Sequence, residues 1–503
     1  MSVADTGEQS QSPMRGQPVL RRTFLKVAAG AWLAGGSLLA ACSQPATSPA
    51  PGAAAPTTAP PAAAPTTAAA AKPTTAAAAA PTAAAAAPTA APQAQATQAP
   101  AKTGAATTLE FWAFGPDRLL FVKEVMQARP EITINYRVFP YQEMHDKLLA
   151  AVTSGRGAPD IVDVEISRFG GFLKGDTVPF VPLNDKIGTD LDSLYQTAAT
   201  DPWSWQGKIY GVGNELNCCL LAYRTDVMST LGVQTPFNTW TDVTAAGKKV
   251  AAAGKSKLFA LHDLHFGDYY ILTQSAGSQL FDESGAFVGD NDAGVSAMQW
   301  LQDQVYKEQI AGIAPADAQN MWNGPAYWAA FKAEQFVGTF GPPWHIGGWM
   351  TNVPDQAGKW TVQPLPKGLG AGKPSASFGG TGQCIPTQSK NQDAAWQVIK
   401  AANFSKEGAL TDFKQRTVFP AYKPAYDLPE LKAPNAYFSG ANFGEIYSTV
   451  APTLVPFRQS PGWPDASDAV NRLVITPVMQ NQKDAKSALT EAKTEIQKTM
   501  AGG

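Results

Sequence analysis

The stretch FVGTFGPPWHIGGW, from Phe336 to Trp349, gathers side chains that are suited to hold a ligand. It contains two tryptophans, two phenylalanines, one histidine, two prolines and four glycines. It shows neither a helical period nor strand alternation across its length. We therefore expect an irregular backbone that presents a ligand platform, with Trp344 as the first candidate contact and Trp349 as the second. The alternative is a loop that plugs the core.

The stretch LHDLHF places His262, Asp263 and His265 close together and invites a metal-binding interpretation. Two histidines three positions apart with one carboxylate are weak evidence for a metal without a third partner. We therefore expect these residues in a loop or at the rim of a ligand cleft, with Asp263 as a ligand contact. We expect no metal site and no cofactor.

No enzyme signature accompanies these residues. The chain has no GxSxG elbow, no HExxH and no SxxK with its partner motifs. A retaining glycosidase needs two carboxylates about 5–5.5 Å apart, and nothing in the sequence indicates such a pair. A formal net charge of −2 and a pI of about 6.1 do not favour nucleic acid as a partner. We expect a binding protein and not an enzyme.

The elements that must position a site begin near residue 108. TLEFWAF, ITINYRVFP and IVDVEI read as strands, separated by amphipathic helical patterns. This alternation predicts a parallel sheet, in which ligands lie beyond the carboxyl ends of the strands. Those ends present Trp112 and Phe114, of which we expect one in the cleft, and then Glu165 and Ser167. The alternative for Glu165 is a solvated charge at a strand end.

The N-terminal segment predicts export and a lipid anchor. Residues 1–41 carry a paired arginine in RRTFLK and an apolar run shorter than the roughly 20 residues of a membrane span. LAAC, which ends at Cys42, resembles a bacterial lipobox, and this implies cleavage before Cys42 and lipidation of its thiol. We therefore expect a Tat-type signal peptide and a protein tethered to the outer face of the bacterial cell membrane.

Residues 42–107 are almost entirely alanine, proline and threonine after the cysteine. Recurrent prolines break each helical turn, and no apolar face exists to offset the entropy of ordering. We expect a disordered linker, and its threonines permit O-glycosylation. In the body, Cys218, Cys219 and Cys384 form no CxxC motif and read as small buried side chains, although their pairing is open.

Several motifs in the body follow one another in an order that resembles the family 1 extracellular solute-binding proteins, the substrate-binding lipoproteins of ABC importers. LAAVTSGRGAPDIVDVEISRFGGF is similar to the family's helix, Gly-x-x-x-Pro-Asp and strand region. WQGKIYGVGNELN, FKAEQFVGTFGPPWHIGGW and SFGGTGQCIPTQSKNQDAAW are similar to three later segments in the family's order. The resemblance, to the maltodextrin-binding type in particular, spans nearly everything after the linker.

The resemblance implies an α/β fold of the type II periplasmic-binding-protein class, with two hinge-linked lobes and a ligand cleft between them. Chain crossings are expected near Glu215–Cys219, Phe378–Cys384 and Lys432–Tyr437. The glycines of FGGTG fit a hinge because glycine tolerates large dihedral changes. The expected lobes are 108–216 with 385–435, and 217–384 with 436–503.

The resemblance further implies that the protein captures a carbohydrate by hinge closure and delivers it to an ABC permease. Aromatic rings bury the apolar faces of sugars, and carboxylates, amides and backbone groups bind their hydroxyls. Trp344 occupies the family's Gly-x-Trp position, and Asn217 aligns with a family ligand position. Further ligand contacts are expected at the hinges, from Asn214, Glu215, Gly379 and Gly380.

Other solutes stay open as alternatives, namely a polyamine, a metal or a phosphodiester. A tethered enzyme that acts on glycans and an adhesion module are the remaining rivals. We expect the protein to act as a monomer.

Overall fold

The computed structural model describes residues 106–115, 118–315, 322, 324–416 and 418–502. The chain divides into two units, residues 1–96 and 97–503, and every described residue lies in the second unit. The signal peptide, Cys42 and the linker up to residue 105 lie outside the described residues, and their roles stay predictions. The first strand begins at Thr107, one residue before the predicted start of the body.

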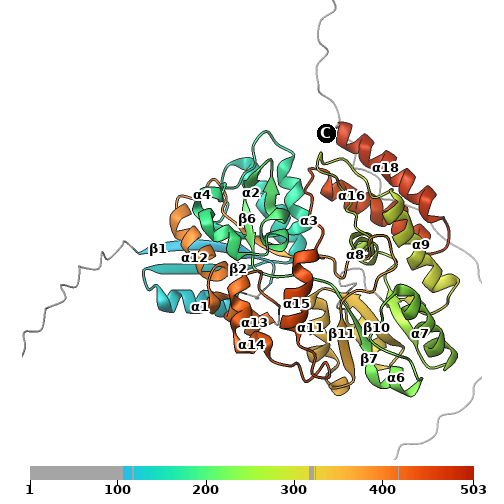
Figure 1. The fold of residues 1–503 in the computed structure, drawn as a ribbon. Coiled ribbons are helices and arrows are strands. Elements are labelled where there is room, and N and C mark those ends of the chain that lie inside the picture. The colour runs from blue at the N-terminus through green and yellow to red at the C-terminus, as the bar shows by residue number, and fades with distance from the viewer. Residues whose placement is uncertain (1–105, 116–117, 316–321, 323, 417, 503) are drawn as a thin grey trace, which may run out of the picture. The chain divides into compact units, whose positions relative to one another are not determined.

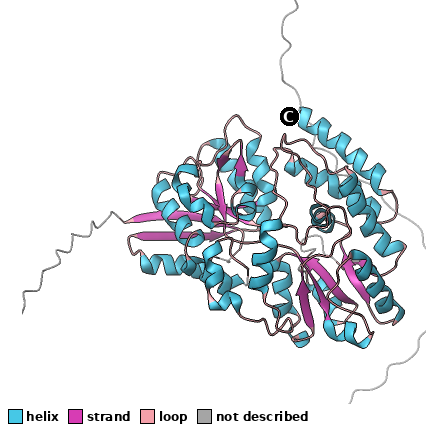
Figure 2. Cartoon of the chain, viewed as in Figure 1, coloured by secondary structure: helices cyan, strands magenta, loops and turns pink. Residues whose placement is uncertain are grey.

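The first lobe is built on a mixed five-stranded sheet (Figures 1 and 2). Its inner strands are parallel, as the pattern of alternating strands and helices predicts, and its last two strands are antiparallel to their neighbours. In spatial order, the strands are β2 (Ile132–Val138), β1 (Thr107–Ala113), β3 (Ile161–Glu165), β12 (Thr381–Cys384) and β6 (Gly211–Gly213).

The second lobe is built on another mixed five-stranded sheet. Its strands β10, β8 and β9 are parallel, whereas β7 pairs antiparallel with both of its neighbours. In spatial order, the strands are β11 (Trp360–Gln363), β7 (Leu220–Arg224), β10 (Phe336–Gly341), β8 (Lys257–Leu261) and β9 (Ala311–Ile313). A short hairpin of β4 (Ser204–Trp205) and β5 (Lys208–Ile209) stands apart from both sheets.

Helices cover both sheets; α1 packs on β2, α12 on β1 and β6, and α7 on β8. Within the described residues, no helix combines the length and the apolar character that crossing a membrane requires. The helices are α1 (Leu119–Ala128), α2 (Tyr141–Ser154), α3 (Ile166–Phe169), α4 (Asn184–Ile187), α5 (Gln196–Ala199), α6 (Thr225–Thr230), α7 (Trp240–Ala252), α8 (Gly267–Ser275), α9 (Asp292–Tyr306), α10 (Pro325–Lys332), α11 (Pro343–Asn352), α12 (Gln392–Asn403), α13 (Lys406–Arg416), α14 (Pro429–Lys432), α15 (Phe443–Val450), α16 (Trp463–Val470), α17 (Thr476–Met479) and α18 (Ala485–Gly502).

Both faces of each sheet are buried. Along β1, Leu109 and Phe111 belong to one buried cluster and Trp112 to another. Along β7, Leu220 and Leu221 likewise separate into the two clusters. Successive strand side chains point to opposite faces, so each cluster fills one side of both sheets. This double burial explains the nearly continuous apolar runs of the strands.

The stretch 336–349 is regular, which contradicts the expectation of an irregular backbone. Its first part is β10, buried at every position between β7 and β8, and its second part begins α11 at Pro343. A strand that is buried on both faces shows no alternation, so its pattern is silent. Proline is well suited to the first helical position, because its missing N–H would have no partner there.

The chain passes between the lobes in neighbouring segments. Residue Leu216 donates a backbone hydrogen bond to Phe419 (2.7 Å), and Cys219 donates one to Ala376 (2.7 Å). The first crossing is thus flanked by the other two on either side. The β12 strand corrects one predicted boundary, because residues 381–384 pair with β3 and β6 in the first sheet and not with the second lobe. The remaining lobe limits stay predictions.

Candidate functional site

A cavity of about 360 Å³ opens among segments of both lobes and the crossings between them. A smaller cavity of about 100 Å³ adjoins it through five shared residues, and we call the two together the cleft. The first cavity is lined by Phe114, Tyr141, Glu165, Glu215, His265, Trp322, Trp344, Phe378, Gly379, Gly380 and Thr381. The second adds Ile166, Ser167, Phe266, Tyr270, Ser377, Phe457 and Trp463.

Aromatic rings from both lobes meet in the cleft. Trp344 lies at the second position of α11, half-buried, with its ring centroid 6.0 Å from that of Trp322 and 6.3 Å from that of Phe378. Its indole N–H donates to the Phe378 carbonyl (3.4 Å). On the first lobe, Phe114 packs edge-on against Tyr141 at 5.3 Å. These rings form apolar walls of the kind that bind the C–H faces of a flat ligand.

The principal acceptor in the cleft is the carboxylate of Glu165, at the end of β3. It caps α3 by accepting from the backbone N–H of Ser167 (2.9 Å), and the Ser167 hydroxyl also donates to it. The hydroxyl of Tyr141 donates to the same carboxylate oxygen (3.1 Å). Burial raises the pKa of Glu165 above its usual value, although these donors and Arg168 oppose the shift. The carboxylate is therefore held in place for a ligand's hydroxyl groups.

Tyr141 links this carboxylate to a cation. The guanidinium of Arg168 lies 5.1 Å from the centre of the Tyr141 ring and donates to its hydroxyl (3.1 Å). Desolvation, together with the charge of Glu165, raises the pKa of the Tyr141 hydroxyl. The hydroxyl therefore stays protonated and remains a hydrogen-bond donor at neutral pH.

His145 fastens the start of α2 to the end of β3. Its Nδ1–H donates to the Tyr141 carbonyl (2.8 Å), and its Nε2 accepts from the backbone N–H of Glu165 (3.2 Å). A ring that must accept at Nε2 is neutral, and burial lowers its pKa to about 4. Burial lowers the pKa of His265 to about 4 as well.

These histidines predict acid sensitivity. Between about pH 6.5 and pH 4 an unfolded histidine binds a proton that folded His145 refuses, so stability is lost as the pH falls. Each such histidine contributes a slope of up to about 1.4 kcal/mol per pH unit. We expect His145→Gln to make the pH dependence of the urea unfolding free energy shallower by up to one proton in this window. Equal slopes for wild type and variant would contradict this account.

The second crossing brings Gly379 and Gly380 to the cleft with positive φ values of 76° and 127°. A Cβ on Gly380 would lie 2.8 Å from the amide nitrogen of Asn217, whereas a Cβ on Gly379 would lie 3.0 Å from the Trp344 indole nitrogen. The backbone thus approaches both side chains closely, which requires glycine at these positions.

We expect Gly380→Ala to destabilise the protein by about 1–3 kcal/mol, through backbone strain and contact with Asn217. Gly440→Ala is the matched control, since Gly440 has a φ of 82° but no atom within 4 Å of the added Cβ. Chemical unfolding of both variants should therefore show the larger loss for Gly380→Ala. An equal loss in the two variants would show that the contact with Asn217 costs nothing.

Seven of the predicted ligand contacts line the cleft. They come from four separate parts of the sequence, which the fold brings together. They are Phe114, Glu165, Ser167, Glu215, Trp344, Gly379 and Gly380. His265 also lines the cleft, as its predicted rim position requires.

Trp112 and Asn214 lie outside the cleft, contrary to expectation. Trp112 is 9 % exposed and belongs to a core cluster, since it points to the face of β1 opposite Phe111. Asn214 is buried, accepts from Arg118 (3.1 Å) and donates to Asp412. Its amide is thus engaged in a buried charged network of the first lobe.

Asn217, Asp263 and Trp349 also do not line the cleft. Asn217 is buried behind Gly380. Asp263 is half-buried in a loop, where its carbonyl accepts from Thr476 (3.0 Å). Trp349 is fully buried among aromatic side chains of the second lobe. The plug interpretation of the aromatic stretch therefore holds for Trp349.

Sequence reasoning missed most aromatic residues of the cleft, among them Tyr141, Trp322 and Phe378. Tyr141 follows directly after the second strand and its proline, so the rule about strand ends could have found it. Trp322 and Phe378 occur in segments without a regular pattern, and no signal in a single sequence distinguishes them from core aromatics.

The described residues contain no group of three or more histidine, cysteine, aspartate or glutamate side chains arranged to hold a metal ion. Cys218, Cys219 and Cys384 are buried free thiols in this structure. His262 pairs with Asp268 (3.0 Å) and stacks on Trp322 at 4.4 Å, behind the cleft. The His262–His265 pair therefore has a structural environment on one side and the cleft on the other.

The model of the family of bacterial extracellular solute-binding proteins matches residues 115–409, more than half of the chain. The chain belongs to this family. Its members are binding proteins, and the two-lobed fold with a cleft between the lobes is the one expected from the motif order. The comparison extends to individual relatives at lower identity.

One relative is an arabinooligosaccharide-binding protein of Bacillus subtilis, which is 29% identical over 402 residues, covering 78% of this chain and 92% of the relative. Among solved structures, the galacto-N-biose-/lacto-N-biose I-binding protein of Bifidobacterium longum superposes with a TM-score of 0.66 at 18% identity, covering 80% of this chain and 98% of that chain. The GacH receptor of Streptomyces glaucescens gives a TM-score of 0.65 at 19% identity, covering 78% and 97%. At these identities the structures show the shared fold.

Proposed function

We propose that this protein captures an oligosaccharide or a sugar derivative by closure of its hinge and delivers it to the permease of an ABC importer. The observation that carries the proposal is the cleft itself. Aromatic rings from both lobes, with Phe114 on one side and Trp344 on the other, face one cavity whose principal acceptor is Glu165. This combination suits the apolar faces and hydroxyl rim of a sugar.

The three crossing segments support closure as the capture step. They lie side by side, joined by backbone hydrogen bonds, and one of them contains Gly379 and Gly380. A ligand that contacts both lobes binds the closed form better than the open form and so shifts the population toward it. The closed form would then be recognised by the permease.

The charge of the cleft weighs against a polyamine. Of the residues that line it, two are carboxylates, Glu165 and Glu215, and the cation of Arg168 lies beside the first. A polycation favours several unopposed carboxylates. A metal or a phosphodiester remains the second kind of alternative, and a tethered glycan-acting enzyme the third.

The binding test is a thermal-shift and calorimetry panel on the purified protein. The arabinooligosaccharide-binding relative makes arabinose-containing oligosaccharides the first probes, followed by maltooligosaccharides and galactosides. Putrescine, spermidine, Zn²⁺, Fe³⁺ and glycerophosphodiesters complete the panel. A saturable sugar response supports the proposal, whereas a clear response to a polyamine, metal or phosphodiester without any sugar response contradicts it.

The lipid anchor is part of the same proposal. The twin-arginine signal and LAAC motif support export by the Tat route and lipidation of Cys42, with a monomeric binding body on the long linker. Replacement Cys42→Ser should release the exported protein from the membrane fraction and abolish the incorporation of labelled palmitate. Retention of the Cys42→Ser protein on the membrane would contradict this part.

A further inference from the structure

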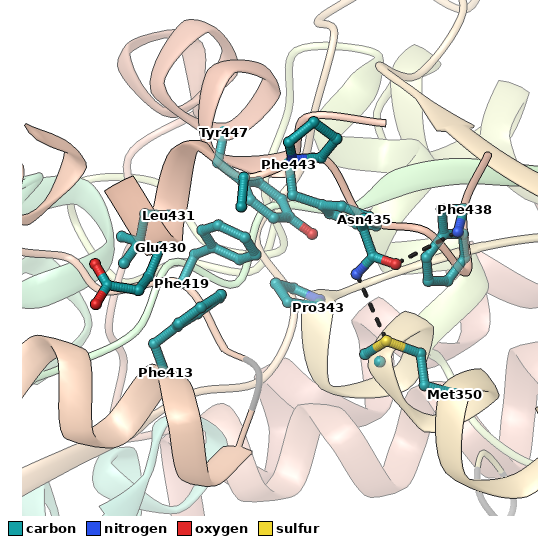
Figure 3. A pocket seen from close by; sticks show the side chains of 13 residues that line it. Pro343, Met350, Phe413, Phe419, Glu430, Leu431, Asn435, Phe438, Phe443 and Tyr447 are labelled. Carbon is teal, nitrogen blue, oxygen red and sulfur yellow. Dashed lines mark hydrogen bonds between the residues drawn. The ribbon is translucent and has the colours of Figure 1, made fainter. Parts of the chain in front are cut away.

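A separate cavity of about 160 Å³ lies beside α11, away from the residues that line the cleft (Figure 3). Pro343, Gly347 and Met350 form its wall on α11, at positions spaced four and three residues apart. Such spacing places them on one face of the helix. None of the residues that line this cavity lines the cleft. We call it the α11 cavity.

Four aromatic rings form much of the remaining wall. Phe413 and Phe419 come from α13 and the segment after it, whereas Phe443 and Tyr447 come from α15. Phe419 lies 4.6 Å from Tyr447 between ring centroids and stacks on Phe443 at 5.9 Å. The cavity is therefore a rigid, aromatic space rather than a gap between flexible side chains.

One polar group points into this apolar space. Tyr447 is fully buried, and its hydroxyl has no hydrogen-bond partner among the described residues. In Figure 3 the hydroxyl points toward the middle of the ring of side chains. Burial raises the pKa of this hydroxyl, so it remains a donor at neutral pH. A buried donor without an acceptor costs free energy, which an occupant with an acceptor would recover.

The polar groups of Asn435 are already engaged. Its side-chain oxygen accepts from the backbone N–H of Tyr437 (3.0 Å), and its amide nitrogen lies 3.5 Å from the sulfur of Met350. Glu430 is the one acidic side chain of the lining. It disfavours an anionic occupant, and the aromatic walls disfavour a strongly hydrated one.

The size of the cavity sets the size of the occupant. A protein cavity of about 150 Å³ with an apolar lining accommodates one benzene ring. We propose that the α11 cavity is a second ligand site, for one small neutral compound with a six-membered aromatic ring and a single hydrogen-bond acceptor. The ring packs among the four aromatic side chains, and the acceptor receives the hydrogen bond from Tyr447.

The site is adjacent to the cleft through α11. Pro343 lines the α11 cavity, and the next residue, Trp344, lines the cleft. The cavity also contacts Leu431, Ala433 and Pro434, next to the predicted third crossing. An occupant therefore touches the helix that carries the aromatic platform, and by linkage its effect on cleft affinity is equal to the effect of the cleft ligand on its own affinity.

The test titrates phenol and benzene into the purified, ligand-free protein and follows binding by calorimetry and ligand-observed NMR. We expect saturable binding of one phenol molecule. Tyr447→Phe should weaken phenol binding about fivefold to tenfold and change benzene binding less than twofold, because only the hydrogen bond is lost. Equal effects on both probes, or no saturable binding of either, would overturn the proposal and leave a cavity that holds solvent only.

A matched pair of variants locates the site. Ala433 lines the cavity at an exposed position, and Ala436 is exposed but does not line it. Ala433→Trp should reduce phenol affinity at least about tenfold, and Ala436→Trp should leave it unchanged. Equal affinities in the two variants would place the probe elsewhere and contradict the assignment. Because no sugar is present, this result is independent of the proposed sugar binding.

Discussion

Replacement Trp344→Ala is expected to weaken sugar binding at least about thirtyfold while the protein stays folded. Trp344 is half-buried at the wall of the cleft, where its ring meets Trp322 and Phe378 edge-on or tilted. A buried aromatic contact at the centre of a binding site typically contributes about 2 kcal/mol or more, which corresponds to this factor. Calorimetry with the best sugar from the panel measures the affinity, and thermal melting measures the fold.

Trp344→Phe is the conservative comparison and should retain part of the affinity, because a ring remains on the same wall. The indole N–H contact with the Phe378 carbonyl is long, at 3.4 Å, so its loss should matter less than the loss of the aromatic face. If Trp344→Ala melts far below wild type and binds sugar normally, Trp344 is a packing residue and the platform assignment is wrong.

Replacement Trp349→Ala is expected to destabilise the protein by about 3–5 kcal/mol, the usual cost of removing a large buried aromatic side chain. Trp349 has no exposed surface, and its ring packs edge-on at 4.8 Å from Trp328 and 5.0 Å from Phe331. Truncation would leave a cavity in the second lobe that these rigid neighbours cannot fill. The midpoint of urea unfolding measures the loss.

Trp349→Phe refines this prediction. The indole N–H of Trp349 has no hydrogen-bond partner among the described residues, so phenylalanine loses volume but no hydrogen bond. We therefore expect Trp349→Phe to recover more than half of the stability that Trp349→Ala loses. Variants of Trp349 that fold still should bind sugar as the wild type does; a selective loss of affinity with unchanged stability would place this residue at the site after all.

The contrast between these two tryptophans shows how far the sequence reaches. Both lie in one aromatic stretch, and both were candidates for the platform. They occupy positions 2 and 7 of α11, a separation that turns them to different sides of the helix. Without the helix the spacing is uninformative, and the helix itself has little signal because prolines and glycines obscure its period.

The site residues follow the same logic. Phe114 and Glu165 were found because parallel strands end at one edge of a sheet, and both line the cleft. Trp112, two residues before Phe114, was not separable by that rule, because its direction depends on the register of β1. Trp322 and Phe378 reach the cleft from loops, where no periodic pattern predicts a direction.

The sequence alone determined the family, the α/β class, the strands of the first lobe and the approximate positions of the crossings, because these depend on local patterns and motif order. Tertiary structure decided which side chains face the cleft and which fill the core. It also decided that β12 belongs to the first sheet. Both depend on contacts between residues far apart in the chain, such as β12 with β3, whose partners a local pattern does not specify.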